Sequence, residues 1–118
     1  MANETTNLKS LEDRIVDLTA RIERRTGAKI VPIQTFAPEP YSLLKPMSVL
    51  IEDSEDGYLA SFFDANIGTS GETEQEAFEN LKSLVLDIFD SLNREAPERL
   101  GPEPARQLAV LRSFIRAA

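Results

Sequence analysis

The stretch of sequence that decides the fold runs from Met47 to Phe63 and reads MSVLIEDSEDGYLASFF. Residues 47–51 are rich in β-formers, and residues 58–63 place alternate side chains on two faces, so each run predicts a strand. Between them lies a polar turn over residues 52–57 that ends in Asp56-Gly57, a pair that tolerates positive φ. The pattern predicts an antiparallel hairpin.

The next residues predict a third strand and a helix. A turn at residues 64–66 precedes a short strand over about 67–70. Thr73 and Glu76 then form a capping box, in which the Thr73 hydroxyl accepts from the Glu76 amide and the Glu76 carboxylate reaches back. The apolar face that follows has helical spacing and predicts a helix over residues 73–93. It consists of Ala77, Leu81, Leu84, Val85, Ile88 and Leu92.

Residues 7–26 have the periodicity of an amphipathic helix. Its apolar side chains occupy the a and d positions of a heptad, with Ile at a and Leu at d, which favours two parallel helices. We therefore expect residues 1–27 to contribute to self-association, with a dimer favoured. The alternative is a helix that lies on its own domain. The apolar residues are Leu8, Leu11, Ile15, Leu18 and Ile22.

The remaining segments flank this central region. Residues 28–46 predict a Pro-rich connector or an edge strand, because Pro32 is incompatible with a central strand. Residues 97–118 predict a loop through residues 100–104 and a short helix that carries Leu108 and Leu111. Residues 47–96 are the expected sheet-and-helix domain.

Composition excludes several chemistries. The chain has 118 residues, the size of one domain, and contains no cysteine, histidine or tryptophan. Disulfides, zinc or haem sites built on Cys or His, cysteine nucleophiles and Ser–His pairs therefore lack their residues. We expect no catalytic residues, no cofactor and no metal, and hence no enzyme.

The charge is concentrated in the middle of the chain. The net charge is −7, and residues 47–96 alone carry −10. An acidic chain does not hold nucleic acid by phosphate neutralisation, so no direct nucleic-acid binding is expected. No export signal and no apolar run of ten residues is present, so we expect a cytoplasmic protein without membrane contact.

One alternative uses the acidic residues as metal ligands. Asp53, Asp56, Asp64 and Glu72 would supply oxygen ligands for magnesium in a divalent-metal nuclease-like remnant. All four lie in turns rich in other acids, where carboxylates are usually solvated surface groups. We rank this alternative lowest.

The order of elements resembles the HicB-like antitoxin family. The resemblance covers residues 47–92 and implies a partial RNase H-like fold, in which a three-stranded antiparallel sheet is backed by a helix without nuclease carboxylates. Members of the family bind and mask a small toxin that cleaves mRNA. The matching residues are Val49-Leu50-Ile51-Glu52, Asp56-Gly57-Tyr58-Leu59-Ala60-Ser61-Phe62, Asp64, Gly71-Glu72-Thr73, Glu76-Ala77 and Asn80.

These observations combine into one expectation. The fold class is α+β: a small three-stranded antiparallel sheet backed by a helix, with an N-terminal amphipathic helix and a short C-terminal helix. The expected function is non-catalytic binding of a small basic protein, as the HicB-like resemblance implies. The alternative is a small oligomeric structural protein without a toxin partner. The expected partner-binding residues are Asp53, Glu55, Asp56, Asp64 and Glu72.

Overall fold

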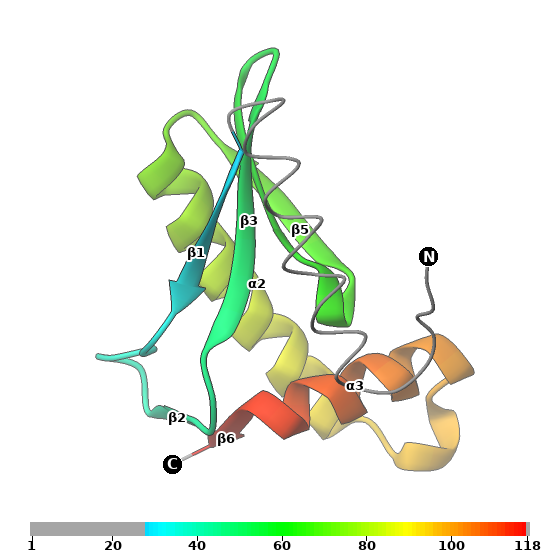
Figure 1. The fold of residues 1–118 in the computed structure, drawn as a ribbon. Coiled ribbons are helices and arrows are strands. Elements are labelled where there is room, and N and C mark those ends of the chain that lie inside the picture. The colour runs from blue at the N-terminus through cyan, green and yellow to red at the C-terminus, as the bar shows by residue number, and fades with distance from the viewer. Residues whose placement is uncertain (1–27, 118) are drawn as a thin grey trace, which may run out of the picture.

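The computed structural model describes residues 28–117. Within them an antiparallel sheet has the strand order β1-β3-β4-β5, a second pair of short strands joins β2 to β6, and two helices pack beside the sheet (Figure 1). The predicted heptad, from Leu8 to Ile22, lies outside the described residues. The strands are β1 (Lys29–Ile33), β2 (Tyr41–Leu43), β3 (Met47–Ser54), β4 (Gly57–Phe62), β5 (Ile67–Gly71) and β6 (Ile115–Ala117); the helices are α2 (Glu74–Arg94), α3 (Pro102–Phe114) and the 3-10 turns η1 (Phe63–Ala65) and η2 (Pro97–Arg99).

The α+β class is confirmed, but the expectation of a three-stranded sheet was wrong. The fourth strand is β1, which pairs with β3 so that Pro32 lies opposite Ser48. This strand is at the edge of the sheet. Proline is tolerated there because it has no backbone N–H to donate, and an edge strand has a neighbour on one side only. Lys29–Ile33 thus forms an edge strand, and the sheet extends beyond the segment predicted for it.

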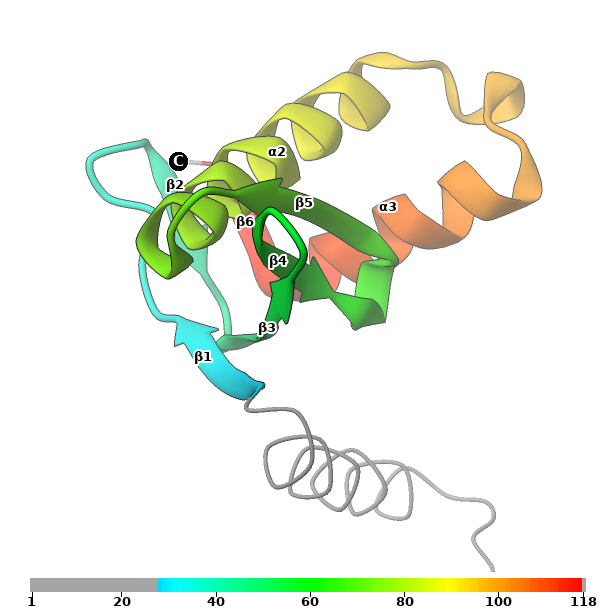
Figure 2. The ribbon, with the colours of Figure 1, turned by 90° about the horizontal axis from the view of Figure 1, so that it is seen from above.

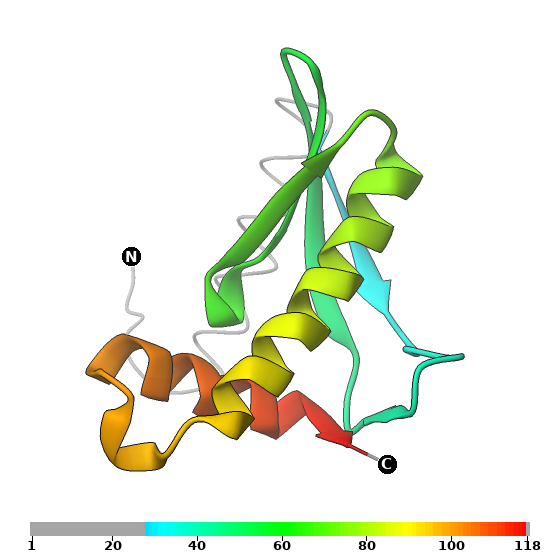
Figure 3. The same ribbon diagram turned by 180° about the vertical axis from the view of Figure 1, so that it is seen from behind.

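The core lies between one face of the sheet and the two helices. Alternate residues of β3, Met47, Val49 and Ile51, are almost fully buried on this inner face. Figure 2 shows α2 and α3 on the same side of the sheet. The Phe62 ring of β4 meets the Phe114 ring of α3 edge to face, with centroids 5.2 Å apart. The helix α3 thus closes the end of the core that α2 does not cover (Figure 3).

Helix α2 begins as its sequence predicts. Thr73 is the N-cap, and its hydroxyl accepts from the Glu76 amide at 3.0 Å. The Glu76 carboxylate accepts from the backbone N–H of Glu72, so two donors at the helix start are satisfied. The buried face differs in part from the predicted one. Ala77, Leu81, Val85, Leu86 and Phe89 are buried, whereas Leu84, Ile88 and Leu92 are half-buried.

Of the two predicted turns, the hairpin turn differs from its prediction in detail. The two-residue turn of the β3–β4 hairpin is Glu55-Asp56, and Gly57 opens β4 with φ of 148°. Positive φ therefore falls on the glycine alone and not on the Asp56-Gly57 pair. The turn at residues 64–66 forms as predicted, with Asn66 in the left-handed region at φ 58°.

The C-terminal helix starts earlier than expected. Helix α3 begins at Pro102, inside the predicted loop, because a proline in the first turn removes only an N–H that has no helical partner. After the helix, β6 pairs with β2, and the Leu44 amide donates to the Phe114 carbonyl at 2.7 Å. The end of the chain is thereby joined to the segment that follows β1.

Candidate functional site

Four of the five predicted partner-binding residues gather at one end of the sheet. Asp53 near the end of β3 lies opposite Tyr58, and Tyr58 lies opposite Gly71, so Asp53 and Glu72 are separated by a single strand. The turn that carries Glu55 and Asp56 is at the same end. All four carboxylates are exposed. We call this group of residues, Asp53, Glu55, Asp56 and Glu72, the acidic end.

Backbone contact between two glycines holds the acidic end together. A Cβ on Gly57 would clash with the carbonyl oxygen of Gly71, and a Cβ on Gly71 would clash with the backbone of Ala77. The hairpin, the end of β5 and the first turn of α2 are therefore in direct main-chain contact. A side chain at either glycine position would separate the two turns that carry the carboxylates.

Neighbouring acids at this end are engaged in structure. The Glu74 carboxylate lies 2.6 Å from the Lys29 ammonium group, and the hydrogen bond between them raises the pKa of Lys29. The Glu76 carboxylate is used by the capping box. In contrast, no ion pair within residues 28–117 involves a carboxylate of the acidic end. These four negative charges face solvent.

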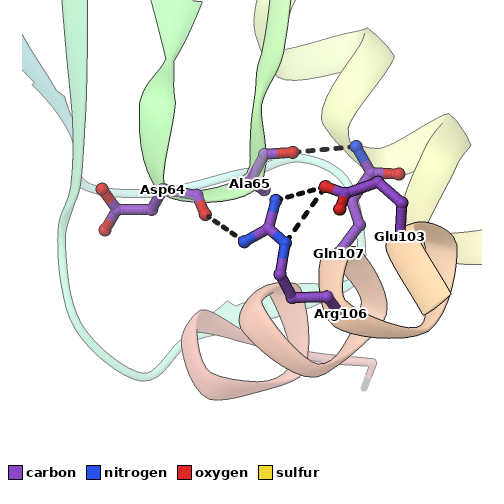
Figure 4. Close-up of polar contacts among 5 residues, drawn as sticks. All are labelled: Asp64, Ala65, Glu103, Arg106 and Gln107. Atoms are coloured by element: carbon purple, nitrogen blue, oxygen red, sulfur yellow. Dashed lines mark hydrogen bonds and ion pairs between the residues drawn. The ribbon is translucent and has the colours of Figure 1, made fainter.

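The fifth predicted residue, Asp64, is at the opposite end of the sheet. It lies in η1, beyond the last residue of β4, and Arg106 of α3 donates to its backbone carbonyl at 3.4 Å. Figure 4 shows its carboxylate directed away from Arg106. The strand β4 separates Asp64 from the acidic end by about 20 Å. The structure therefore does not bring Asp64 together with the other four residues.

Side-chain contacts dominate the end that holds Asp64. The Gln107 amide donates to the Ala65 carbonyl at 2.8 Å, and Arg106 pairs with Glu103 at 2.7 Å (Figure 4). Hydrogen bonding in this pair lowers the pKa of Glu103 and raises that of Arg106. These contacts fasten η1 to α3. Sequence reasoning missed them, because Arg106 and Gln107 lie 42 positions from their acceptors.

The carboxylates do not form a metal centre. Among residues 28–117, no three acidic side chains are grouped closely enough to hold a metal ion. The magnesium alternative thus finds no ligand set in the described part of the chain.

Across residues 28–117, no helix combines the length and the apolar character needed to cross a bilayer.

The junction residues that carry the HicB-like resemblance have structural roles here. Gly71 allows close contact with Ala77, and Thr73 caps α2. The Asn80 amide donates to the Ser70 carbonyl at 2.9 Å and so ties α2 to β5. These residues form a strand-to-helix junction. Their pattern accounts for the local fold and does not by itself specify a partner.

Comparison of the chain with models of protein families, with curated proteins and with solved structures produced no match.

Proposed function

We propose that the protein is a non-catalytic binding module that captures a small basic protein through its acidic end. The observation that carries this proposal is the exposure of Asp53, Glu55, Asp56 and Glu72 at one end of the sheet, without an ion pair within residues 28–117. The neighbouring carboxylates of Glu74 and Glu76 already have partners within the chain, so they are less able to bind a cation of another protein.

The physical advantage of this arrangement is that the charges are held in place before binding. A patch of one sign attracts a partner of opposite sign during diffusion and disfavours partners with the same sign. The two-residue turn and the glycine contacts fix the hairpin, so little backbone entropy is lost on association.

The HicB-like resemblance suggests an RNA-cleaving toxin as the partner. The dimer predicted from the heptad residues is a separate prediction, which concerns Leu8, Leu11, Ile15, Leu18 and Ile22.

The test compares two variants of equal net charge. In the first, the acidic end is neutralised by Asp53→Asn, Glu55→Gln, Asp56→Asn and Glu72→Gln. In the second, four exposed acids elsewhere are neutralised by Glu39→Gln, Asp64→Asn, Glu95→Gln and Glu98→Gln. Each full chain is used to recover proteins from native lysate, and bound proteins are identified by mass spectrometry. Binding of the recovered partner is then measured with purified components at two salt concentrations.

We expect the parent chain and the second variant to bind a basic protein, with affinity that falls as salt rises. The first variant should lose this binding. Equal binding by both variants, or equal loss in both, contradicts a role for the acidic end. Circular dichroism of each variant verifies that the fold is retained.

A further inference from the structure

The two edges of the sheet are protected to different degrees. The strand order places β1 at one edge and β5 at the other (Figure 1). An open edge is usually blocked by a charge, a proline, a bulge or a covering element, because its unpaired backbone groups can bind another strand. The edge strand β1 carries Lys29 and Pro32. The edge strand β5, Ile67–Gly71, contains neither a charge nor a proline.

The register shows which backbone groups of β5 point away from β4. The two-residue hairpin turn makes Gly57 part of a hydrogen-bonded pair with β3, and the bonding direction alternates from residue to residue along a strand. Three residues further along β4, Ala60 therefore faces β5 and bonds to its partner there, Thr69. The backbone groups of Gly68 and Ser70, on either side of Thr69, consequently point outward from the sheet.

Contacts of the two outward residues agree with this direction. The Ser70 carbonyl accepts from the exposed side chain of Asn80 at 2.9 Å and not from β4. Among residues 28–117, no strand pairs with β5 on this side, and both Gly68 and Ser70 are exposed. A Cβ at Gly68 would lie 3.5 Å from its nearest atoms, so packing within this part of the chain does not require glycine there. Glycine does allow a second backbone to approach closely.

We propose that the basic partner docks by adding an extended segment to the open edge of β5, antiparallel to it, with basic residues at the amino end of that segment. This inference rests on the proposed function, because the edge leads into the acidic end: Glu72 directly follows Gly71. Antiparallel addition continues the bonding pattern of the sheet and brings the amino end of the new strand beside Glu72. Backbone hydrogen bonds then supply affinity, and the carboxylates select a basic segment.

Charge makes a second copy of the chain a poor occupant of this edge. Two β5 strands paired antiparallel about Thr69 would place Glu72 of one copy opposite Asn66 of the other, close to Asp64 in sequence. Each chain also carries a net charge of −7. Since like charges oppose pairing, a segment with basic residues suits the edge better than the chain itself does.

The test uses the full chain and a synthetic peptide, Lys-Lys-Thr-Val-Thr-Val-Thr, in which β-forming residues follow a basic amino end. A control peptide, Lys-Lys-Thr-Pro-Pro-Pro-Thr, keeps the charge but lacks the central N–H donors. Amide hydrogen exchange of the chain is followed by NMR with and without each peptide, and both affinities are measured. The measurements are repeated with Ser70→Pro, which removes an outward N–H without removing a bond to β4, and with Ser70→Ala as the matched control.

In the free chain, the amides of Gly68 and Ser70 should exchange rapidly and that of Thr69 slowly. The first peptide should slow exchange at Gly68 and Ser70 about tenfold or more, and Ser70→Pro should weaken its binding about tenfold relative to Ser70→Ala. Equal affinity for the two peptides, or unchanged exchange at these amides at the highest peptide concentration, overturns the proposal. Slow exchange of both amides in the free chain also overturns it, and a dependence on protein concentration would assign the edge to a second copy.

The variant with the neutralised acidic end separates this inference from the proposed function. Loss of peptide binding in that variant, with full binding by Ser70→Pro, would support the acidic end and overturn strand addition. Loss in Ser70→Pro alone would support strand addition and contradict binding by the acidic end. Circular dichroism and urea denaturation verify that both Ser70 variants fold, and the exchange data on the parent chain do not depend on either variant.

Discussion

The two ends of the sheet are held in different ways. At the acidic end, the elements meet through main-chain contact at Gly57 and Gly71. At the opposite end, side chains add to the backbone pairing of β2 with β6: Phe62 packs on Phe114, and Tyr41 donates a hydrogen bond to Asp90. At the acidic end, close backbone contact leaves the four carboxylates exposed, whereas at the other end large side chains close the core.

If the acidic end binds a partner as proposed, this difference separates binding from stability. The residues in backbone contact at the acidic end are Gly57, Gly71 and Ala77, whereas the carboxylates belong to exposed neighbours, so we expect these carboxylates to contribute little to folding. The side chains at the other end are largely used for packing and hydrogen bonding. Substitution of the carboxylates at the acidic end should consequently change partner binding more than stability. Substitution of the packed side chains at the other end should mainly lower the free energy of unfolding.

The largest effect is expected at the core end. Phe62→Ala removes a fully buried ring and its contact with Phe114, and should lower the free energy of unfolding by about 3–5 kcal/mol. Urea denaturation measures the change. The adjacent Phe63→Ala is the control, since 62 % of Phe63 is exposed, and it should cost less than about 1 kcal/mol. Similar losses in both variants would contradict the packing described for Phe62.

The next effect tests the backbone contact at the acidic end. Gly71→Ala introduces a Cβ against the backbone of Ala77 and should cost about 1–3 kcal/mol. Gly68→Ala is a matched control in the same strand, because its Cβ would lie 3.5 Å from the nearest atoms. We expect that variant to be within about 0.5 kcal/mol of the parent. Denaturation curves of the two variants that coincide would rule out the close contact.

A smaller effect concerns the hydrogen bond that the Tyr41 hydroxyl donates to Oδ2 of Asp90, in which the two oxygens are 2.5 Å apart. This bond raises the pKa of Tyr41, so the folded state resists ionisation of the phenol. The corresponding stability is present below the ordinary tyrosine pKa and is lost as pH rises through the folded pKa. Tyr41→Phe should cost about 1 kcal/mol at neutral pH. The difference between parent and variant should shrink above about pH 10; a difference that stays constant across this range would disprove the assignment.

The smallest effect on stability is expected from the carboxylates themselves. Glu55→Gln with Asp56→Asn should change the free energy of unfolding by less than about 0.5 kcal/mol, because both side chains are exposed and have no ion pair within residues 28–117. Thermal melting of the double variant measures this change. A clear loss of stability would mean that these charges support the fold and would weaken their assignment to binding.

Local patterns predicted the elements well. The alternation around the hairpin, the capping box at Thr73 and the turn at residues 64–66 each depend on residues near one another in the chain. The pairing of β1 does not follow from its own residues, because Pro32 excludes a central position but does not specify that β3 will be the neighbouring strand. The start of α3 differs from its prediction, because two prolines within residues 102–104 are typical of a loop but are also compatible with the first turn of a helix.

The candidate site was partly accessible from sequence. Charge density drew attention to all five acids, but a one-dimensional pattern cannot show which turns lie at the same end of a sheet. The register assigns Asp53, Glu55, Asp56 and Glu72 to one end and Asp64 to the other. The ion pair between Lys29 and Glu74 also depends on the tertiary structure, because the two residues are distant in the chain and meet only when β1 joins the sheet.

By itself, the sequence determined the α+β class, the strand and helix segments of the central region, and the concentration of negative charge there. These properties follow from periodicity, capping and composition, which act over a few residues. Only the tertiary structure decided the place of β1, the contact between Gly57 and Gly71, and the division of the acids between two ends. These depend on antiparallel register and on close packing between distant segments, which local patterns do not encode.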